Sequence, residues 1–189
     1  MNRIRQLLTI AVLATIASAC ASGPTRYLHP NADLGAIKKV AVLPFENVSG
    51  VAGSSDKVHK LFLVELLSLE IFDVVEPGAV SKVIRGETAG TPDQLTPDDL
   101  KRIGKALGAD GLFMGQIVDY QDPRGAAGGG PEITLQFRLV EVTSGATIWS
   151  TSETRAGVKV STRLFGVSGD SITEATRKVI QRQLATLLK

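Results

Sequence analysis

The hydrophobic and polar positions divide most of the chain into segments with the spacing of strands or of helices. Short runs rich in β-branched and apolar residues predict strands, and apolar residues that recur every three or four positions predict helices that bury one face. The order predicts an α/β domain, with a mixed sheet flanked by helices and no visible repeat. The expected elements are strand 37–45, helix 54–70, strand 72–76, a helix from Pro77 to near Gly86, a helix between Thr96 and Gly108, strand 109–120, strand 133–142, a strand within 146–160 and helix 170–188.

Local signals mark where several of these helices begin and end. Ser54 and Ser55 are candidate N-caps of the first helix. Residues 96–99, Thr-Pro-Asp-Asp, combine a cap, a proline at the first helical position and two acids at the positive end of the helix dipole. Gly108 is a natural residue with which to end that helix.

The expected strands carry their own position-specific features. Apolar and polar residues alternate along 133–142 until Leu139–Val140, where the shift in phase predicts a bulge or burial on both faces. Gly115 permits close approach of a neighbouring element, and Ser144–Gly145 predicts a tight turn between antiparallel strands. We expect Trp149, the sole tryptophan, to be half-buried in a packing role, in preference to a binding hot spot.

The first residues have the pattern of a secretory signal. A short basic start precedes an apolar core from Leu7 to Ala17, too short to span a membrane, and Ser18–Ala19 supplies small residues for cleavage. The only cysteine, Cys20, follows directly. The run 17–20 resembles the bacterial lipobox, whose cysteine is diacylated, and Ala21 after it implies outer-membrane sorting. The alternatives are a secreted protein with a free thiol or an uncleaved anchor.

These features predict three regions of the chain. Residues 1–19 are the lipoprotein signal peptide, and residues 20–36 are the lipidated cysteine and a flexible tether. The tether contains two prolines and two glycines and is expected to be neither helix nor strand. Its 16 residues after Cys20 would reach roughly 55 Å when fully extended. Residues 37–189 are the expected periplasmic domain.

Charge and cysteine usage exclude several classes of partner and site. Without residues 1–19 about 170 residues remain, which suits one domain. The two arginines of the signal account for the net charge of +2, so 19 basic and 19 acidic residues balance in the mature chain. That balance argues against nucleic-acid binding and against electrostatic membrane binding beyond the lipid. No cysteine remains for a disulfide or a cysteine-ligated metal site.

The sequence contains no convergent set of catalytic groups. His29 lies in the tether, and His59 is interpreted as a solvated residue on a helix face. The run 125–130, GAAGGG, is followed by a strand where a phosphate-binding loop would need a helix, so it predicts a flexible hairpin connection. The first-turn position explains Asp98 and Asp99. We therefore expect no enzyme activity, no cofactor and no metal site.

Four stretches, 40–50, 72–77, 103–120 and 138–150, resemble the CsgG-like and LpoB-like superfamily of outer-membrane lipoproteins. The resemblance spans residues 37–189. It implies an α/β domain similar to anticodon-binding domains, without RNA binding. A CsgG-type pore inserts long membrane hairpins, and the two candidate insertions here, 121–132 and 161–170, are too short for a crossing pair of strands.

The sequence therefore favours a non-enzymatic adaptor or structural subunit of an envelope assembly. The alternative is a component of a CsgG-type secretion or transport complex. The expected partners are the membrane, through acyl chains on Cys20, an envelope protein that the sequence does not name, and a possible homo-oligomer. The candidate partner-binding loop lies within residues 46–55, between the first strand and the first helix, and comprises Glu46, Asn47, Val48, Ser49 and Gly50.

Overall fold

Seven strands form one mixed sheet in the computed structural model, which describes residues 23–87, 95–122, 130–156 and 170–188. The sheet order is β1-β7-β6-β5-β2-β4, and β3 pairs with β5 outside this path. The pairs β1–β7, β7–β6 and β6–β5 are antiparallel. The pairs β5–β2, β2–β4 and β3–β5 are parallel. The strands are β1 Thr25–Leu28, β2 Lys39–Val42, β3 Glu46–Asn47, β4 Asp73–Val74, β5 Gly111–Gln121, β6 Glu132–Glu141 and β7 Thr147–Arg155.

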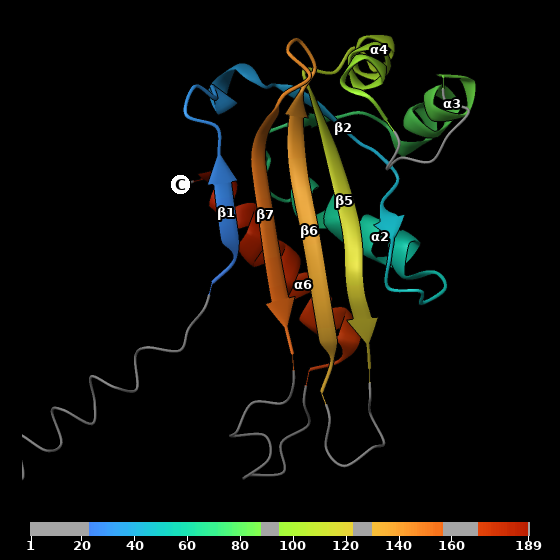
Figure 1. Cartoon of the computed structure of the whole chain (residues 1–189), viewed down its shortest axis with the longest axis vertical. Helices are drawn as coiled ribbons and strands as arrows, with labels where there is room; N and C mark the ends of the chain where they lie inside the picture. The colour runs from blue at the N-terminus through green and yellow to red at the C-terminus, as the bar shows by residue number, and fades with distance from the viewer. Residues whose placement is uncertain (1–22, 88–94, 123–129, 157–169, 189) are drawn as a thin grey trace, which may run out of the picture.

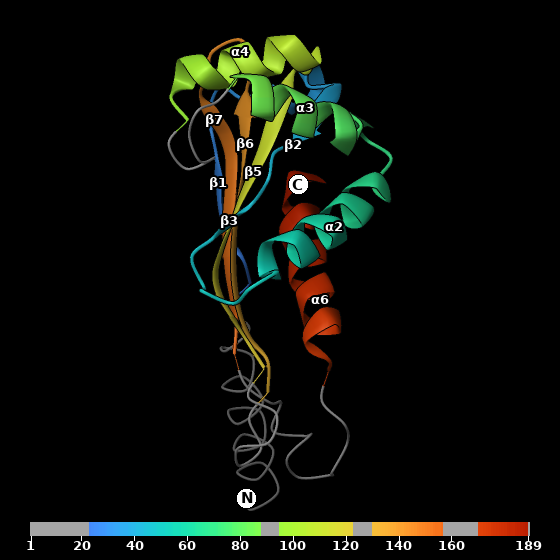
Figure 2. The ribbon, with the colours of Figure 1, turned by 90° about the vertical axis from the view of Figure 1, so that its right-hand side faces the viewer.

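Helices lie on both faces of the sheet but cover them unequally. The long helices α2 and α6 lie side by side behind the sheet, and α3 and α4 lie at one end of it (Figures 1 and 2). This arrangement confirms the expected α/β class, with a mixed sheet flanked by helices in one domain. The helices are α2 Ser54–Leu67, α3 Pro77–Glu87, α4 Pro97–Leu107 and α6 Ile172–Leu184, with short 3-10 turns at Leu34–Ala36 and Ala185–Leu188.

The larger core lies between the sheet and the pair α2–α6. Phe62 on α2 packs against Phe137 of β6, with ring centroids 4.6 Å apart, and against Phe45 at 5.3 Å. Trp149 of β7 is fully buried in the same core, so the expectation of a half-buried tryptophan is wrong, although the packing role is right. Its Nε1–H donates to the Thr186 hydroxyl at 3.0 Å, which provides the polar partner that a buried indole needs.

The smaller core lies between the opposite face of the sheet and the pair α3–α4. Leu100, Ile103 and Leu107 of α4 are buried there beside Val142. Gly104 lets the helix come close, because a Cβ at this position would lie 2.2 Å from a methyl group of Val142. These two helices cover only one end of the sheet, so the rest of this face has no helix over it among the described residues (Figure 1).

Several local expectations are confirmed. The Thr96 hydroxyl accepts from the Asp99 amide and the Asp99 carboxylate accepts from the Thr96 amide, which forms a capping box. Gly108 ends α4 with a φ of 59°, and Gly145 turns the chain with a φ of 73°. The β6–β7 register shifts between Leu139 and Val140, where the change of phase predicted a bulge or burial on both faces, and both side chains are buried.

The start of α2 differs from expectation. Gly53 precedes the helix with a φ of 74° and no side-chain cap bond, and Ser54 and Ser55 are its first two residues. Glycine adopts this left-handed backbone without a steric cost. The two serines are therefore not N-caps.

The expected tether is wrong over part of its length. Thr25–Leu28 forms β1 and Leu34–Ala36 forms a 3-10 turn. The β1 strand pairs antiparallel with β7, from Thr25 opposite Ser152 to Leu28 opposite Trp149. Pairing with a strand more than a hundred residues away gives this segment an order that its own composition does not indicate.

Candidate partner-binding surface

The predicted partner-binding loop is attached to the sheet at its start. Glu46 and Asn47 form β3, which pairs with β5 opposite Gln116 and Ile117. The Gln116 side-chain amide donates to the Glu46 carboxylate at 2.6 Å. The amides of the next two residues, Val48 and Ser49, both donate to the Ile117 carbonyl, at 2.9 and 3.0 Å. The loop therefore leaves the sheet at a defined point.

Hydrogen bonds within the loop hold the remaining residues together. The Asn47 side-chain amide donates to the Val51 carbonyl at 2.8 Å, and the Ser49 hydroxyl donates to the Asn47 side-chain oxygen at 2.8 Å. Gly50 has a φ of 74°, a conformation that L side chains rarely adopt. Since the polar groups bond to one another, the loop presents its apolar side chains outward: Val48 is 53% exposed and Val51 38%.

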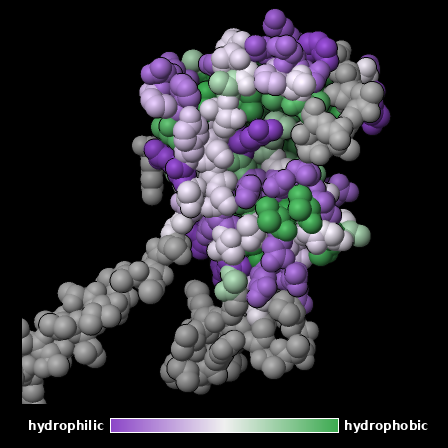
Figure 3. All heavy atoms as spheres, viewed as in Figure 1, coloured by the Kyte–Doolittle hydropathy of each residue, from purple (hydrophilic) through white to green (hydrophobic). Residues whose placement is uncertain are grey.

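A groove of about 400 Å³ lies beside this loop, on the part of the sheet that α3 and α4 leave uncovered. Its lining is mostly polar, with a carboxylate, two amides, a guanidinium, a hydroxyl and one thioether. Figure 3 shows this face in white to purple, the colours of intermediate to hydrophilic residues, with a green apolar patch beside it. The residues that supply these groups are Glu46, Gln116, Gln136, Arg138, Ser150 and Met114.

Gly115 of β5 leaves space for two aromatic rings beside the groove. A Cβ on Gly115 would lie 2.7 Å from Phe45 and 2.8 Å from Phe137, so the glycine makes room for both rings. The predicted close approach is confirmed. Phe45 is buried in the larger core, while the next residue, Glu46, lines the groove.

The groove was not predicted from the sequence, although the alternation of apolar and polar residues along 133–142 marks one of its walls. Thr134, Gln136 and Arg138 are the polar members of the alternation along β6, and their cross-strand partners on β7 are Thr154, Ser152 and Ser150. Alternation identifies which face of a strand is polar. It does not tell whether a helix covers that face, which depends on the whole fold.

His59 is not the solvated residue that its helix pattern suggested. Its ring packs edge-on against Phe45, with centroids 5.0 Å apart, and its buried Nε2 has no hydrogen-bond partner among the described residues. Burial lowers the pKa of His59 below its ordinary 6.5, against the opposing effects of a backbone hydrogen bond with Val42 and the charge of Asp56. The prediction was wrong because Phe45 covers this side of α2.

Other perturbed carboxylates have structural partners. The amides of Lys39 and Lys38 donate to Asp110 at 2.8 and 3.0 Å, which lowers the pKa of its carboxyl and ties the start of β2 to the start of β5. Burial raises the pKa of Glu153, although its ion pair with Arg182 opposes this shift. Each group has a partner that explains its position without a reaction.

The predictions for the signal, the anchor and the two candidate membrane insertions concern residues that lie wholly or mostly outside the described ranges. Cys20, the signal 1–19 and most of the loop 121–132 and of residues 161–170 lie outside the described residues. Within the described ranges, no helix is both long and apolar enough to cross a membrane. In that same part of the chain, His, Asp and Glu residues do not gather in threes as metal ligands would.

No protein-family profile matches the chain, and no curated protein sequence matches it. Solved structures show the fold. PelC from Paraburkholderia phytofirmans, crystallised as a dodecamer, is 18% identical, with a TM-score of 0.59 over 87% of this chain and 95% of PelC. Lipoprotein GNA1162 from Neisseria meningitidis is 16% identical, with a TM-score of 0.56 over 79% of this chain and 99% of that one. The chain therefore has the fold of these two proteins.

Proposed function

We propose that this chain is an envelope lipoprotein, cleaved after Ala19 and held by acyl chains on Cys20 at the periplasmic face of the outer membrane. Its domain acts as a non-enzymatic adaptor or structural subunit of an envelope assembly. The lipobox-like run 17–20 supports the anchor. A lipoprotein from Neisseria meningitidis has the same fold.

The preorganised loop beside the polar groove is the observation that carries the proposal of a binding function. Val48 and Val51 are exposed on a loop whose polar groups are already bonded to one another, so little ordering is needed when a partner binds. Apolar anchors surrounded by polar groups are typical of protein interfaces. We propose that the loop 46–51 and the groove together form the partner-binding surface.

A photo-crosslinking amino acid at position 48, in the full-length protein in its native cells, tests this surface. We expect a defined crosslinked product at position 48, because Val48 lies at the proposed contact. The matched control is position 64 on α2, since Val64 is also an exposed valine, at 60%, but lies outside the loop and groove. Equal products at both positions, or a product at position 64 alone, would contradict the proposal.

A second candidate function is that of a subunit in an oligomeric transport assembly. The observation that favours it is the dodecameric PelC, which has the same fold. Mass determination of the lipidated protein in mild detergent tests this candidate. A ring of eight or more subunits that conducts ions across a planar bilayer favours transport, and a monomer or dimer favours the adaptor.

A further inference from the structure

The first strand of the sheet starts only a few residues after the proposed anchor. Two interactions hold Thr25 in the sheet. Its carbonyl accepts a hydrogen bond from the Thr151 hydroxyl at 2.9 Å, and β1 pairs along β7 from this residue onward. The strand is further fixed by the Arg26 guanidinium, which donates to the Thr186 carbonyl at 3.2 Å, and by the His29 amide, which donates to the Ile148 carbonyl at 2.9 Å. The folded domain therefore begins at Thr25.

This short connection limits how far the domain can stand from the lipid. Five residue steps separate Cys20 from Thr25, so the fully extended connection reaches about 17 Å. The expected tether through residue 36 would have reached about three times as far. If Cys20 carries acyl chains, as the proposed function requires, the start of β1 lies close to the membrane surface.

Two parts of the domain lie far from the strand that the connection holds near the membrane. The sheet edge at β4 lies five strand spacings from β1, about 24 Å away. Along the strands, Thr25 lies opposite Ser152, and β7 begins five residues before Ser152, a distance of about 17 Å. Helix α4 lies beyond that end, since Pro97 and Lys101 pack against Gly145 in the turn that precedes β7. The connection holds neither place at the membrane, and contact there requires the domain to lie flat along the surface.

We propose that the domain rests on a lipid surface by the sheet edge at β1, with the corner formed by α3, α4 and β4 directed away from the membrane. The side chains of β1 fit this contact. Tyr27 is 49% exposed and Leu28 37%, on the edge strand that directly follows the connection. Tyrosine is enriched at membrane–water interfaces, where its ring is apolar and its hydroxyl remains hydrated. The exposed Arg26 adds a cation suited to lipid phosphate.

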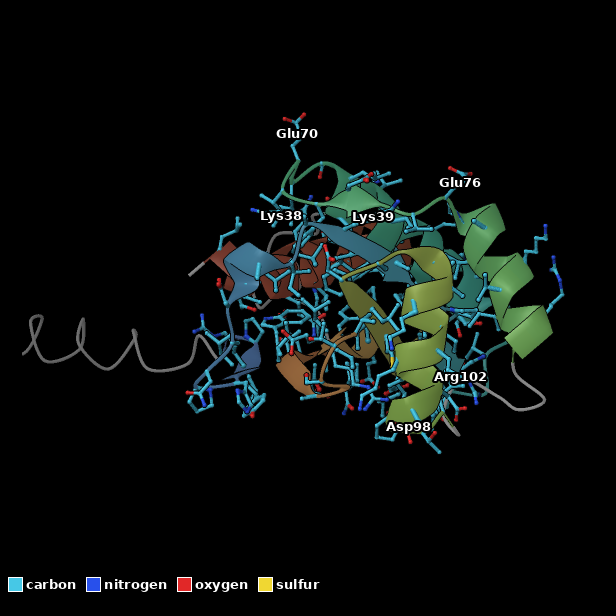
Figure 4. The ribbon with its side chains drawn as sticks, turned by 90° about the horizontal axis from the view of Figure 1, so that it is seen from above. Lys38, Lys39, Glu70, Glu76, Asp98 and Arg102 are labelled. Atoms are coloured by element: carbon cyan, nitrogen blue, oxygen red, sulfur yellow. The ribbon has the colours of Figure 1, made fainter. Side chains whose placement is uncertain are left out.

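The opposite corner has the chemistry of a surface that stays in water. Figure 4 views this end of the molecule from above and shows that charged side chains surround it, with Glu70 and Glu76 extending away from the ribbon. Moving such charges against a membrane would remove their hydration, which is costly. The labelled residues at this end are Lys38, Lys39, Glu70, Glu76, Asp98 and Arg102.

The absence of any cysteine other than Cys20 allows a direct test with single introduced thiols. The full-length lipoprotein, purified in detergent, is labelled with a fluorophore at Thr25→Cys, Glu76→Cys or Asp98→Cys. It is then reconstituted into phosphatidylethanolamine–phosphatidylglycerol vesicles that carry a nitroxide on the lipid headgroup. We expect loss of fluorescence for the label at position 25 and retained fluorescence at positions 76 and 98. Equal loss at all three, or greater loss at 76 or 98, overturns the orientation.

The wild-type protein separates failure of the anchor from failure of the orientation. A wild-type chain that takes up the thiol label at Cys20 and does not float with vesicles is not acylated, which overturns both proposals. A chain that floats, but whose three labels respond equally, overturns the orientation alone.

Two further variants test the causes that we assign. Twenty Gly and Ser residues inserted between Ser22 and Gly23 add a span of about 25 Å, so the difference between positions 25 and 98 should shrink while flotation is kept. An unchanged difference would show that the short connection does not orient the domain. Tyr27→Glu should reduce the loss at position 25 and Tyr27→Trp should preserve it. Identical behaviour of these two variants would overturn the contact through β1.

Discussion

The two faces of the sheet use the same strands in different ways. On the face covered by α2 and α6, Phe137 of β6 lies in a cluster of aromatic rings that is almost completely closed to water. On the other face, Gln136 and Arg138 of the same strand line a groove. Strand β6 thus stabilises the domain with one set of alternate residues and forms a candidate binding surface with the other.

If the open face binds the partner, as proposed, the two faces should respond differently to substitution. Substitutions on the covered face should act on stability, because those side chains are packed on all sides. Substitutions on the open face should act on partner binding with little effect on stability, since water already reaches these side chains. The following predictions test whether the two faces separate in this way, with stability measured in the Cys20→Ser form and crosslinking in the full-length protein.

Phe62→Ala should have the largest effect on stability. Phe62 is fully buried between α2 and the sheet and contacts the rings of Phe45, Phe113 and Phe137. Its removal should lower the free energy of unfolding by about 3–5 kcal/mol, measured by urea denaturation. Val64→Ala, on the exposed side of the same helix, is the control and should change it by less than about 0.5 kcal/mol. Similar losses in both variants would mean that α2 is not packed as described.

Gly115→Ala should destabilise the protein by about 1–3 kcal/mol, because the added methyl group forces Phe45 and Phe137 out of their positions. Gly78→Ala on α3 provides a comparison of opposite sign. No atom lies within 4 Å of a Cβ at Gly78, so alanine there should stabilise the helix by up to about 1 kcal/mol. A Gly115→Ala variant with unchanged stability would contradict the close approach of Phe45 and Phe137 to Gly115.

His59 should make stability depend on pH. Its pKa is lowered in the folded state, so the unfolded chain binds a proton more readily than the folded chain does. Its contribution is therefore complete above the ordinary pKa of 6.5 and is lost as the pH falls below that value. Urea denaturation between pH 7.5 and 5 should show a steeper loss in the wild type than in His59→Leu, as a consequence of linkage. Equal slopes in the wild type and His59→Leu would show that His59 does not titrate differently on folding.

Gln136→Ala should have the smallest effect on stability, below about 0.5 kcal/mol, because its side chain is exposed on the open face. The same substitution should weaken crosslinking from position 48, since Gln136 lines the groove beside the loop. A large loss of stability, or crosslinking at the wild-type level, would remove the distinction between the faces.

Local features of the fold could be predicted from the sequence. The prediction of where α4 begins was correct, because a cap, a proline and two acids act within one helical turn at Thr96–Asp99. The register shift at Leu139–Val140 was correct because a change in alternation records which side chains face the core. The candidate loop was correctly placed between β2 and α2, although the sequence did not indicate that Glu46 and Asn47 pair with β5.

Features that depend on distant contacts could not be predicted. The burial of His59 depends on Phe45, which reaches it from another element. Trp149 is fully buried because β1 and the last turn of the chain close over β7. The groove could be predicted only by knowing that no helix among the described residues covers the part of the sheet face beyond α3 and α4. In each case the deciding contact joins residues that no local sequence pattern relates.

The pairing of β1 with β7 also has a consequence for the order of folding. Thr25 and Thr151 are 126 positions apart, and Arg26 and Thr186 are 160 apart. Contacts of such long range form late, because a long loop must close before they are made. We therefore expect β1 to join the sheet last, after the hairpins of β5, β6 and β7 have formed. Until then Thr25–Leu28 remains unpaired. If Cys20 is acylated as proposed, this late pairing leaves the chain beside it open to a peptidase and an acyltransferase while the domain folds.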